Sequence, residues 1–128
     1  MSLKNKLRVM VVDDMTVSRG LLVQSLEDMG LVHVDHHKSG DAALPLLAAN
    51  PVHLVISDFN MPGMNGLDLL ENLRVNQTTK GIGFILVTGS PTPEIISRGR
   101  KLGLNNIVKK PFTTATLKSA VETVVGRL

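Results

Sequence analysis

The sequence predicts an α/β domain in which a parallel sheet of five strands has helices on both faces. Short apolar runs rich in β-branched residues alternate five times along the 128-residue chain with segments of helical periodicity. The best-defined runs do not alternate between apolar and polar residues, which is typical of strands buried on both faces of a parallel sheet. Strand-helix alternation of this kind requires right-handed crossover connections.

The five strands are expected at regular intervals along the chain. Residues 7–12, 52–56 and 82–87 are the central candidates because their apolar runs are the longest. Residues 31–36 and 106–109 form shorter runs and are expected nearer the edges of the sheet.

Helical segments are indicated between these strands by apolar residues that recur on one face. Three sets show the spacing: Leu22, Leu26 and Met29; Ile95, Gly99 and Leu102; and Leu117, Val121, Val124 and Leu128.

Helix boundaries are marked by capping residues. Thr92 before Pro93 suits an N-cap followed by proline at the first helical position, where the missing N–H costs nothing. Gly103 suits a helix C-terminus, and Thr113 is expected to cap the last helix.

Length and composition predict one domain over residues 1–128, with no output domain and no linker. The absence of cysteine excludes disulfides and thiolate chemistry within the given sequence. The first twelve residues lack the apolar run of a signal peptide, and no stretch approaches the roughly 20 apolar residues that span a bilayer. A cytoplasmic location is therefore expected. The chain is also expected to be a monomer.

The net charge of +3 is unevenly distributed. Residues 91–128 carry +5, so the remainder sums to −2. With three Phe and no Tyr or Trp, the chain has few side chains that could stack on bases. We interpret the basic third as a solvated face and expect no nucleic-acid binding.

Polar residues follow four of the predicted strands, at the carboxyl ends where open parallel sheets collect function. The pairs or triplets are Asp13-Asp14, Ser57-Asp58, Thr88-Gly89 and Lys109-Lys110-Pro111. If the strands concerned are neighbours, these groups converge on one pocket. Asp-Asp after a strand also occurs in simple turns and helix caps, and Thr88 or Lys110 alone says little. It is the combination that favours a functional site.

Three convergent carboxylates pose an electrostatic problem. Two unit charges about 4 Å apart repel by roughly 1 kcal/mol in water and about 4 kcal/mol at an effective dielectric of 20. Such a cluster must take up a proton or bind a cation. Hard carboxylate oxygens, without His or Cys, select Mg2+ or Mn2+. A nearby lysine and hydroxyl would serve a phosphoryl group, and a carboxylate can accept one as an acyl phosphate.

The residues around these strand ends resemble the response-regulator receiver family, particularly its single-domain, CheY-like chemotaxis members. The resemblance rests on Val11-Val12-Asp13-Asp14, on residues 56–67 with their D-x-N-M-P-x-M-x-G pattern, on Val87-Thr88, and on Lys110-Pro111-Phe112-Thr113 with Ala115-Thr116-Leu117. It extends over essentially the whole chain. It implies a flavodoxin-like, CheY-like (βα)5 fold; the strand order 2-1-3-4-5 comes with the resemblance and not from the periodicities.

The resemblance also implies a metal site. Asp14 and Asp58 match the carboxylate ligands of Mg2+, which Mn2+ can replace. Asp13 lies near the metal in this family, with water between, and the backbone carbonyl of Asn60 matches the remaining protein ligand.

Roles in phosphoryl chemistry follow from the same match. Asp58 corresponds to the phosphoacceptor, Thr88 to the hydroxyl that moves to meet the phosphoryl oxygen, and Lys110 to the lysine that pairs with the acceptor. The Lys110–Pro111 bond is implied to be cis. Lys109 is expected on the other face of its strand, at the surface.

One position departs from the family pattern. CheY-like receivers commonly carry Tyr or Phe where this chain has Ile107, and a β-branched side chain has few rotamers for a switching movement.

Two positions govern the access of hydrolytic water to the phosphoryl group in this family. They lie two residues beyond the acceptor and two beyond the threonine, and here they are Asn60 and Ser90. Both are uncharged and of small or medium size, which predicts a short-lived phosphoryl group.

The implied function is a phosphorylatable switch in a two-component chemotaxis system. A histidine kinase of the CheA type would be the phosphodonor, and the flagellar motor switch or a phosphatase the further partner. The chain would catalyse only its own phosphorylation and dephosphorylation and would not be an enzyme for a separate substrate. A phosphate sink that drains the kinase, or a phosphorelay intermediate, stays open as an alternative.

Other classes fit the sequence less well. An Asp-nucleophile phosphatase of the haloacid-dehalogenase type would need D-x-D after the first strand, where Asp13-Asp14-Met15-Thr16 stands. A flavodoxin would need a phosphate-binding loop there, and the P-loop pattern is missing from the given sequence. A histidine metal site is not expected, because adjacent His36 and His37 point to opposite faces of a strand.

Overall fold

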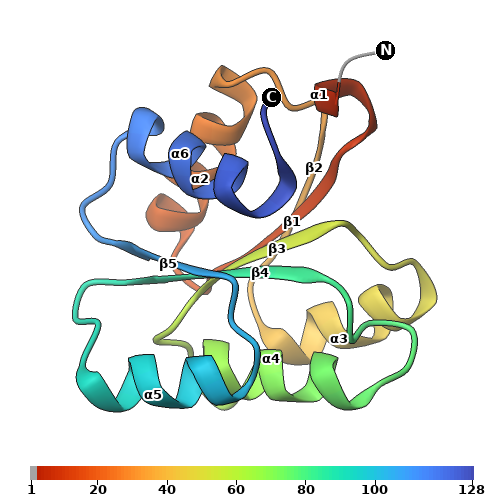
Figure 1. Ribbon diagram of the computed structural model, residues 1–128, viewed down its shortest axis with the longest axis vertical. Helices are drawn as coiled ribbons and strands as arrows, with labels where there is room; N and C mark the ends of the chain where they lie inside the picture. The colour runs from red at the N-terminus through yellow and green to blue at the C-terminus, as the bar shows by residue number, and fades with distance from the viewer. Residues whose placement is uncertain (1–2) are drawn as a thin grey trace.

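The computed structural model describes residues 3–128, which form one parallel sheet between two layers of helices (Figure 1). The strands are β1 (Arg8–Val12), β2 (His33–His37), β3 (Leu54–Asp58), β4 (Gly83–Thr88) and β5 (Asn106–Lys109). Every neighbouring pair is parallel, in the order β2-β1-β3-β4-β5. The predicted fold class and strand order are confirmed, and the segments at 31–36 and 106–109 lie at the edges as predicted.

Helices cover both faces of the sheet. They are α1 (Leu3–Lys6), α2 (Thr16–Asp28), α3 (Gly40–Ala49), α4 (Gly66–Val75), α5 (Pro93–Lys101) and α6 (Thr114–Val125). In Figure 1, α2 and α6 lie on one face and α3, α4 and α5 on the other. The one-turn α1 has no counterpart among the predicted elements. Within residues 3–128, no helix is both long enough and apolar enough to cross a membrane.

Two apolar layers result from the alternation of side chains along each strand. Val9 and Val11 point toward α2 and α6, whereas Met10 and Val12 point toward α3 and α4. Ile107 is partly buried and packs against the second layer. Both faces of the central strands are therefore buried, which explains why their sequences do not alternate.

Strand boundaries differ slightly from the predicted ones. β3 begins two residues later than predicted and continues through Asp58, and β4 continues through Thr88. The ladder extends this far because Asp58 still pairs with Val87, and Thr88 with Lys109. Asp58 and Thr88 are thus held by sheet hydrogen bonds instead of lying in flexible loops.

The predicted caps are present. The hydroxyl of Thr92 accepts from the N–H of Ile95, and Thr113 forms a capping box with Thr116. One helix boundary was wrong: the pattern that included Leu128 predicted a longer last helix. α6 ends at Val125 because Gly126 has a positive φ of 97°, and the chain then turns so that Leu128 packs on the core outside the helix.

Candidate functional site

The sheet order brings three carboxylates together at the carboxyl ends of β1 and β3. Asp13 and Asp14 directly follow β1, and Asp58 is the last residue of β3, its neighbour in the sheet. One oxygen from each side chain lies within 4.8 Å of the others. We call Asp13, Asp14 and Asp58 the acid cluster.

The acid cluster contains carboxylate oxygens without hydrogen-bond donors. Asp13 is fully buried, and its Oδ1 accepts from the backbone N–H of Met15 at 3.0 Å. Asp13 Oδ2 and Asp14 Oδ1 are buried with no hydrogen-bond partner among the protein atoms. Buried carboxylate oxygens are costly unless they are paired or bind a cation. The donor set is all oxygen, so the residues present fit a hard divalent ion such as Mg2+.

Lys110 supplies a positive charge beside Asp58. Its Nζ lies 2.9 Å from Asp58 Oδ1, while the Asp58 side chain is almost completely buried. Burial raises the pKa of the Asp58 carboxyl above its ordinary value; the hydrogen bond from Lys110 opposes this shift and the charge of Asp13 adds to it. One ammonium group therefore does not fully compensate the buried negative charge.

Thr88 and Lys110 are held beside Asp58 by the backbone. The N–H of Phe59 donates to Val87 O at 3.0 Å, and the N–H of Lys110 donates to Thr88 O at 2.9 Å. The buried Thr88 hydroxyl accepts from the N–H of Ser90 at 3.2 Å. The Lys110–Pro111 bond is cis, the isomer that the resemblance implies.

A close backbone approach beside the acid cluster requires glycine at the start of α4. A Cβ on Gly66 would lie 2.5 Å from the carbonyl oxygen of Asp58, closer than packed atoms come. The N–H of Gly66 donates to Phe59 O at 3.0 Å. Gly66 belongs to the motif on which the resemblance rests, but its steric role becomes visible only in the structure.

Other predicted residues lie around the site or away from it. Asn60 and Ser90 are exposed in the loops after β3 and β4. Lys109 is exposed, as predicted. Ile107 is not part of the acid cluster; it packs in the layer beneath α5.

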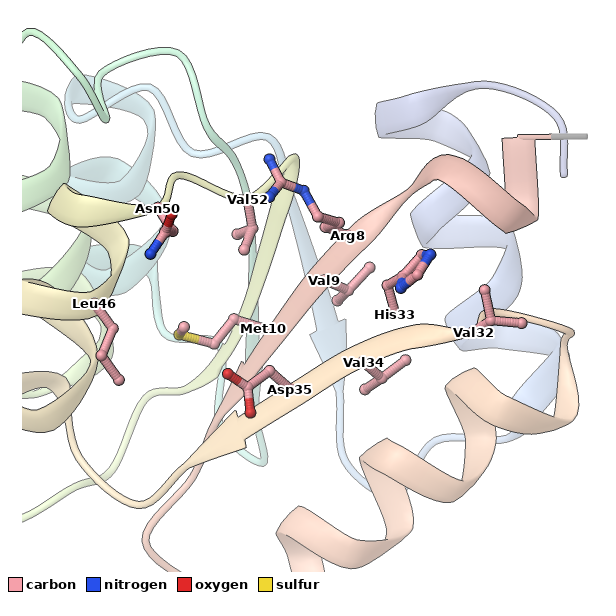
Figure 2. A pocket seen from close by; sticks show the side chains of 10 residues that line it. All are labelled: Arg8, Val9, Met10, Val32, His33, Val34, Asp35, Leu46, Asn50 and Val52. Carbon is pink, nitrogen blue, oxygen red and sulfur yellow. The ribbon is translucent and has the colours of Figure 1, made fainter.

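The histidine-rich edge of the sheet forms a separate pocket (Figure 2). Arg8 and His33 lie along it with Asp35, and none of its lining residues belongs to the acid cluster. His37 Nε2 and Asp35 Oδ2 form a pair at 3.2 Å. Within residues 3–128, the acid cluster is the one place where three His, Asp or Glu side chains come close enough to share an ion.

An exposed apolar groove beside Lys110 was missed by sequence reasoning. Met15, Val17 and Leu21 are large, exposed apolar side chains at the start of α2, and the groove they line continues to Pro111 and Phe112. Val17 and Leu21 have the i, i+4 spacing of residues on one helix face. This spacing is the sequence feature that could have indicated the groove. We call this surface the α2 groove.

Comparison with known proteins places this geometry in a family. Residues 9–122 match the model of the response regulator receiver domain. The chain is 39% identical over its full length, and over 99% of the relative, to the Rhizobium etli protein described as "Probable chemotaxis protein CheY". It is 33% identical to chemotaxis protein CheY-3 of Vibrio cholerae, covering 98% of this chain and 97% of the relative.

A solved structure of a chemotaxis protein has the same fold as this chain. Chemotaxis protein CheY4 of Vibrio cholerae superposes with a TM-score of 0.86 at 28% identity, covering 92% of this chain and 98% of that one. The chain belongs to the response regulator receiver domain family. It is therefore a signalling domain of two-component systems, as the sequence predicted.

Replacing Asp14 with Asn tests the electrostatic account of the acid cluster. Removing one of three clustered charges relieves a repulsion of roughly 1 kcal/mol. The melting temperature without metal should therefore rise by about 3–5 °C, and the further rise on adding Mg2+ should shrink. Differential scanning calorimetry with and without 10 mM Mg2+ measures both.

The matched control is Asp28→Asn, which removes the same charge at the far end of α2, where Gln24 donates to the carboxylate. It should leave the Mg2+ response unchanged. Equal Mg2+ responses in Asp14→Asn and the wild type would contradict a metal site at the acid cluster.

Proposed function

We propose that this receiver accepts a phosphoryl group on Asp58 in a reaction that requires Mg2+, and that the modified protein changes its partner binding. One observation carries the proposal: buried Asp58 pairs with Lys110 and lies within 4.8 Å of Asp13 and Asp14, each of which has a buried oxygen without a hydrogen-bond donor. Such a carboxylate is placed both to hold a cation and to react.

Asp14 and Asp58 are the proposed carboxylate ligands of Mg2+, with Asp13 close by and the backbone carbonyl of Asn60 completing the protein ligands; Mn2+ can substitute. The ion would neutralise charge on the phosphoryl oxygens. Lys110 would also pair with the phosphoryl oxygens. Thr88 would exchange its hydrogen bond from Ser90 for one that it donates to the phosphoryl group.

The transfer step balances without another reactant. A carboxylate oxygen of Asp58 forms a bond to phosphorus while the bond from phosphorus to the donor's imidazole nitrogen breaks. The phosphohistidine reacts with a proton on its other ring nitrogen, so the ring leaves as neutral imidazole and the products are an acyl phosphate and a neutral histidine. Hydrolysis of the acyl phosphate by water returns the carboxylate and inorganic phosphate. The chain thus acts on itself, and no separate metabolite is proposed as a substrate.

A histidine kinase of the CheA type is the proposed donor, because relatives that match this chain over nearly its full length bear chemotaxis names. The α2 groove supports a protein donor: its exposed apolar side chains lead directly to Lys110. We propose that the donor's histidine-bearing domain packs on this groove while its phosphohistidine reaches Asp58.

We propose that the chain acts as a monomeric, cytoplasmic receiver domain. The flagellar motor switch is one candidate partner, with a phosphatase as another. Ile107 favours a second candidate, a phosphate sink or relay intermediate, because a β-branched side chain beneath α5 has few alternative rotamers.

Labelling with two donors tests the proposal. Asp58→Asn should lose labelling from radioactive acetyl phosphate and from a phosphorylated CheA-type kinase alike, while its circular dichroism stays that of a folded protein. Leu21→Lys, in the α2 groove, should slow transfer from the kinase at least tenfold and leave labelling by acetyl phosphate unchanged, because only a protein donor needs the groove.

Mg2+-dependent labelling of Asp58→Asn at wild-type level would refute Asp58 as the acceptor. Wild-type kinetics of Leu21→Lys with the kinase would refute docking on the α2 groove alone.

The lifetime of the phosphoryl group should be short. Asn60 and Ser90 are exposed and uncharged, so water can reach the acyl phosphate without steric block or charge repulsion. We expect a half-life on the order of seconds to a minute, and since tenfold in rate is only about 1.4 kcal/mol, one side chain can change it. Asn60→Arg or Ser90→Phe should slow hydrolysis several-fold and still be phosphorylated. Phosphoryl loss after donor removal, in excess Mg2+, measures this; a wild-type half-life of hours would contradict it.

A further inference from the structure

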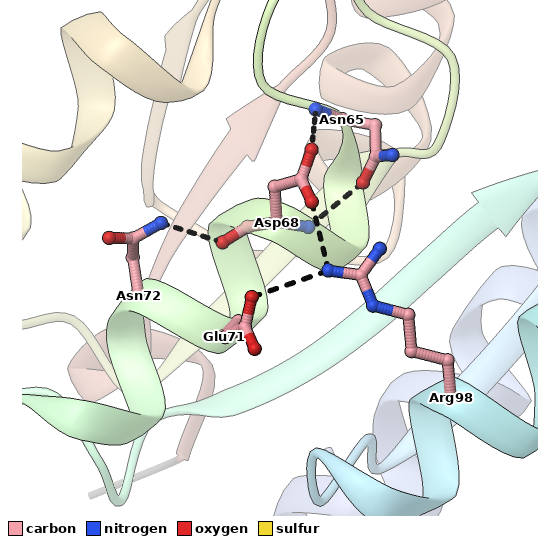
Figure 3. Close-up of polar contacts among 5 residues, drawn as sticks. All are labelled: Asn65, Asp68, Glu71, Asn72 and Arg98. Carbon is pink, nitrogen blue, oxygen red and sulfur yellow. Dashed lines mark hydrogen bonds and ion pairs between the residues drawn. The ribbon is translucent and has the colours of Figure 1, made fainter.

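An ion pair joins α5 to α4 (Figure 3). Arg98 Nη2, from α5, lies 2.8 Å from Asp68 Oδ1 and 3.4 Å from Glu71 Oε1, both on α4. The pairing with Arg98 lowers the pKa of the Asp68 carboxyl, with help from the N–H of Asn65, so Asp68 is charged at neutral pH. Asp68 is thus the principal partner of Arg98.

Asp68 is also tied to the loop that follows Asp58. Its Oδ2 accepts from the N–H of Asn65 at 3.0 Å, and Asn65 Oδ1 accepts from the N–H of Asp68 at 2.8 Å. This capping box fixes the first turn of α4. Gly66, in the same turn, donates to the carbonyl of Phe59, the residue next to Asp58. The position of Arg98 therefore depends on a short chain of contacts that begins at Asp58.

A different connection leads from Thr88 to the start of α5. Only the residues from Gly89 to Pro91 separate Thr88 from Thr92, the N-cap of α5. The loop is braced by the bond from the N–H of Ser90 to the Thr88 hydroxyl and by the bond from the N–H of Thr92 to Ser90 O. A movement of Thr88 toward a phosphoryl group on Asp58 would pull on this end of the helix.

The opposite end of α5 is fixed. Arg74, at the end of α4, donates from Nε to Leu102 O and from Nη2 to Gly103 O, just past the C-terminus of α5. Its Nη1 donates to the carbonyls of Lys80 and Ile82. This network anchors the C-terminal end of α5, so a displacement of the helix is a pivot about that end. Arg98 lies in the last turn of α5, about one turn from this anchor, and a pivot about the anchor changes its orientation toward α4.

We propose that the Arg98–Asp68 pair is a latch that holds α5 in the unphosphorylated position and opens when Asp58 is phosphorylated. The inference rests on the proposed function of Asp58. It also assigns a role that Ile107 cannot fill: with no aromatic side chain to swing beneath α5, the ion pair sets the position of the helix. The side chains of Arg98 and Asp68 are 39% and 37% exposed, so solvent screens the pair and its effect is limited to about two- to fivefold in an equilibrium.

Beryllofluoride, a mimic of the phosphoryl group, tests the latch through linkage. Because the mimic binds the open form, a latch that stabilises only the unactivated form lowers the apparent affinity for the mimic in proportion to the fraction of protein that remains open. Arg98→Ala should therefore bind beryllofluoride with Mg2+ two to five times more tightly than the wild type. Asp68→Asn, which keeps an oxygen for the cap, should do the same. The double variant should add nothing further, because both changes remove one interaction.

The matched control is Arg100→Ala, on an exposed residue of α5 that forms no ion pair among residues 3–128. It should leave the affinity for beryllofluoride unchanged. Unchanged or weaker binding by Arg98→Ala would overturn the latch.

Hydrogen exchange of the unactivated protein separates failure of the latch from failure of the proposed function, since it requires no phosphoryl mimic. Amides of residues 95–101 should exchange two to five times faster in Arg98→Ala than in the wild type, because local opening of α5 is easier. Equal exchange would overturn the latch. A wild type that binds no beryllofluoride would instead refute the proposed function, whatever the exchange shows.

Discussion

Repulsion among three carboxylates is the constraint on which the functional end of this molecule depends. The sheet order makes β1 and β3 neighbours, and their ends place Asp13, Asp14 and Asp58 within 4.8 Å of one another. Burial keeps water from relieving that charge, and Lys110 compensates only one of the oxygens. Such a cluster lowers the stability of the metal-free protein, and local features that cost stability are expected at functional sites. Binding a cation, and through it a phosphoryl group, is the function that fits this cluster.

The surrounding backbone keeps the acid cluster in place. Asp58 remains within the β3–β4 ladder, and Gly66 lets α4 begin against the Asp58 carbonyl. The same first turn of α4 carries Asp68, so the residue that pairs with α5 is positioned by the loop that leaves the acceptor. Chemistry at Asp58 and the position of α5 are thereby linked through about one turn of helix.

The fold was predictable because its signals are local. Apolar runs without alternation, the caps at Thr92 and Thr113 and the glycine at 103 each act within a few residues. The acid cluster was predictable for a related reason: parallel strands collect their ends at one edge, so residues that follow strands come together. Strand boundaries were less accurate since only the partner strand decides whether Asp58 and Thr88 still pair.

Long-range side-chain contacts carried no such signal. Arg98 and Asp68 are separated by 30 residues, and no local sequence pattern around either residue indicates that the two side chains pair. Arg74 is similar: its acceptors are backbone carbonyls, which every residue offers. The exposed apolar side chains of the α2 groove have helical spacing, but the spacing alone does not tell which face meets the core.

Paramagnetic broadening by Mn2+ in amide NMR spectra tests the central claim most directly, since the ion substitutes for Mg2+ and marks its own position. If the acid cluster holds the cation, substoichiometric Mn2+ should first broaden the amides of residues 13–15 and 58–60, and excess Mg2+ should restore them. Broadening centred on the histidine-rich strand at residues 33–37, or broadening that Mg2+ does not reverse, would contradict the account.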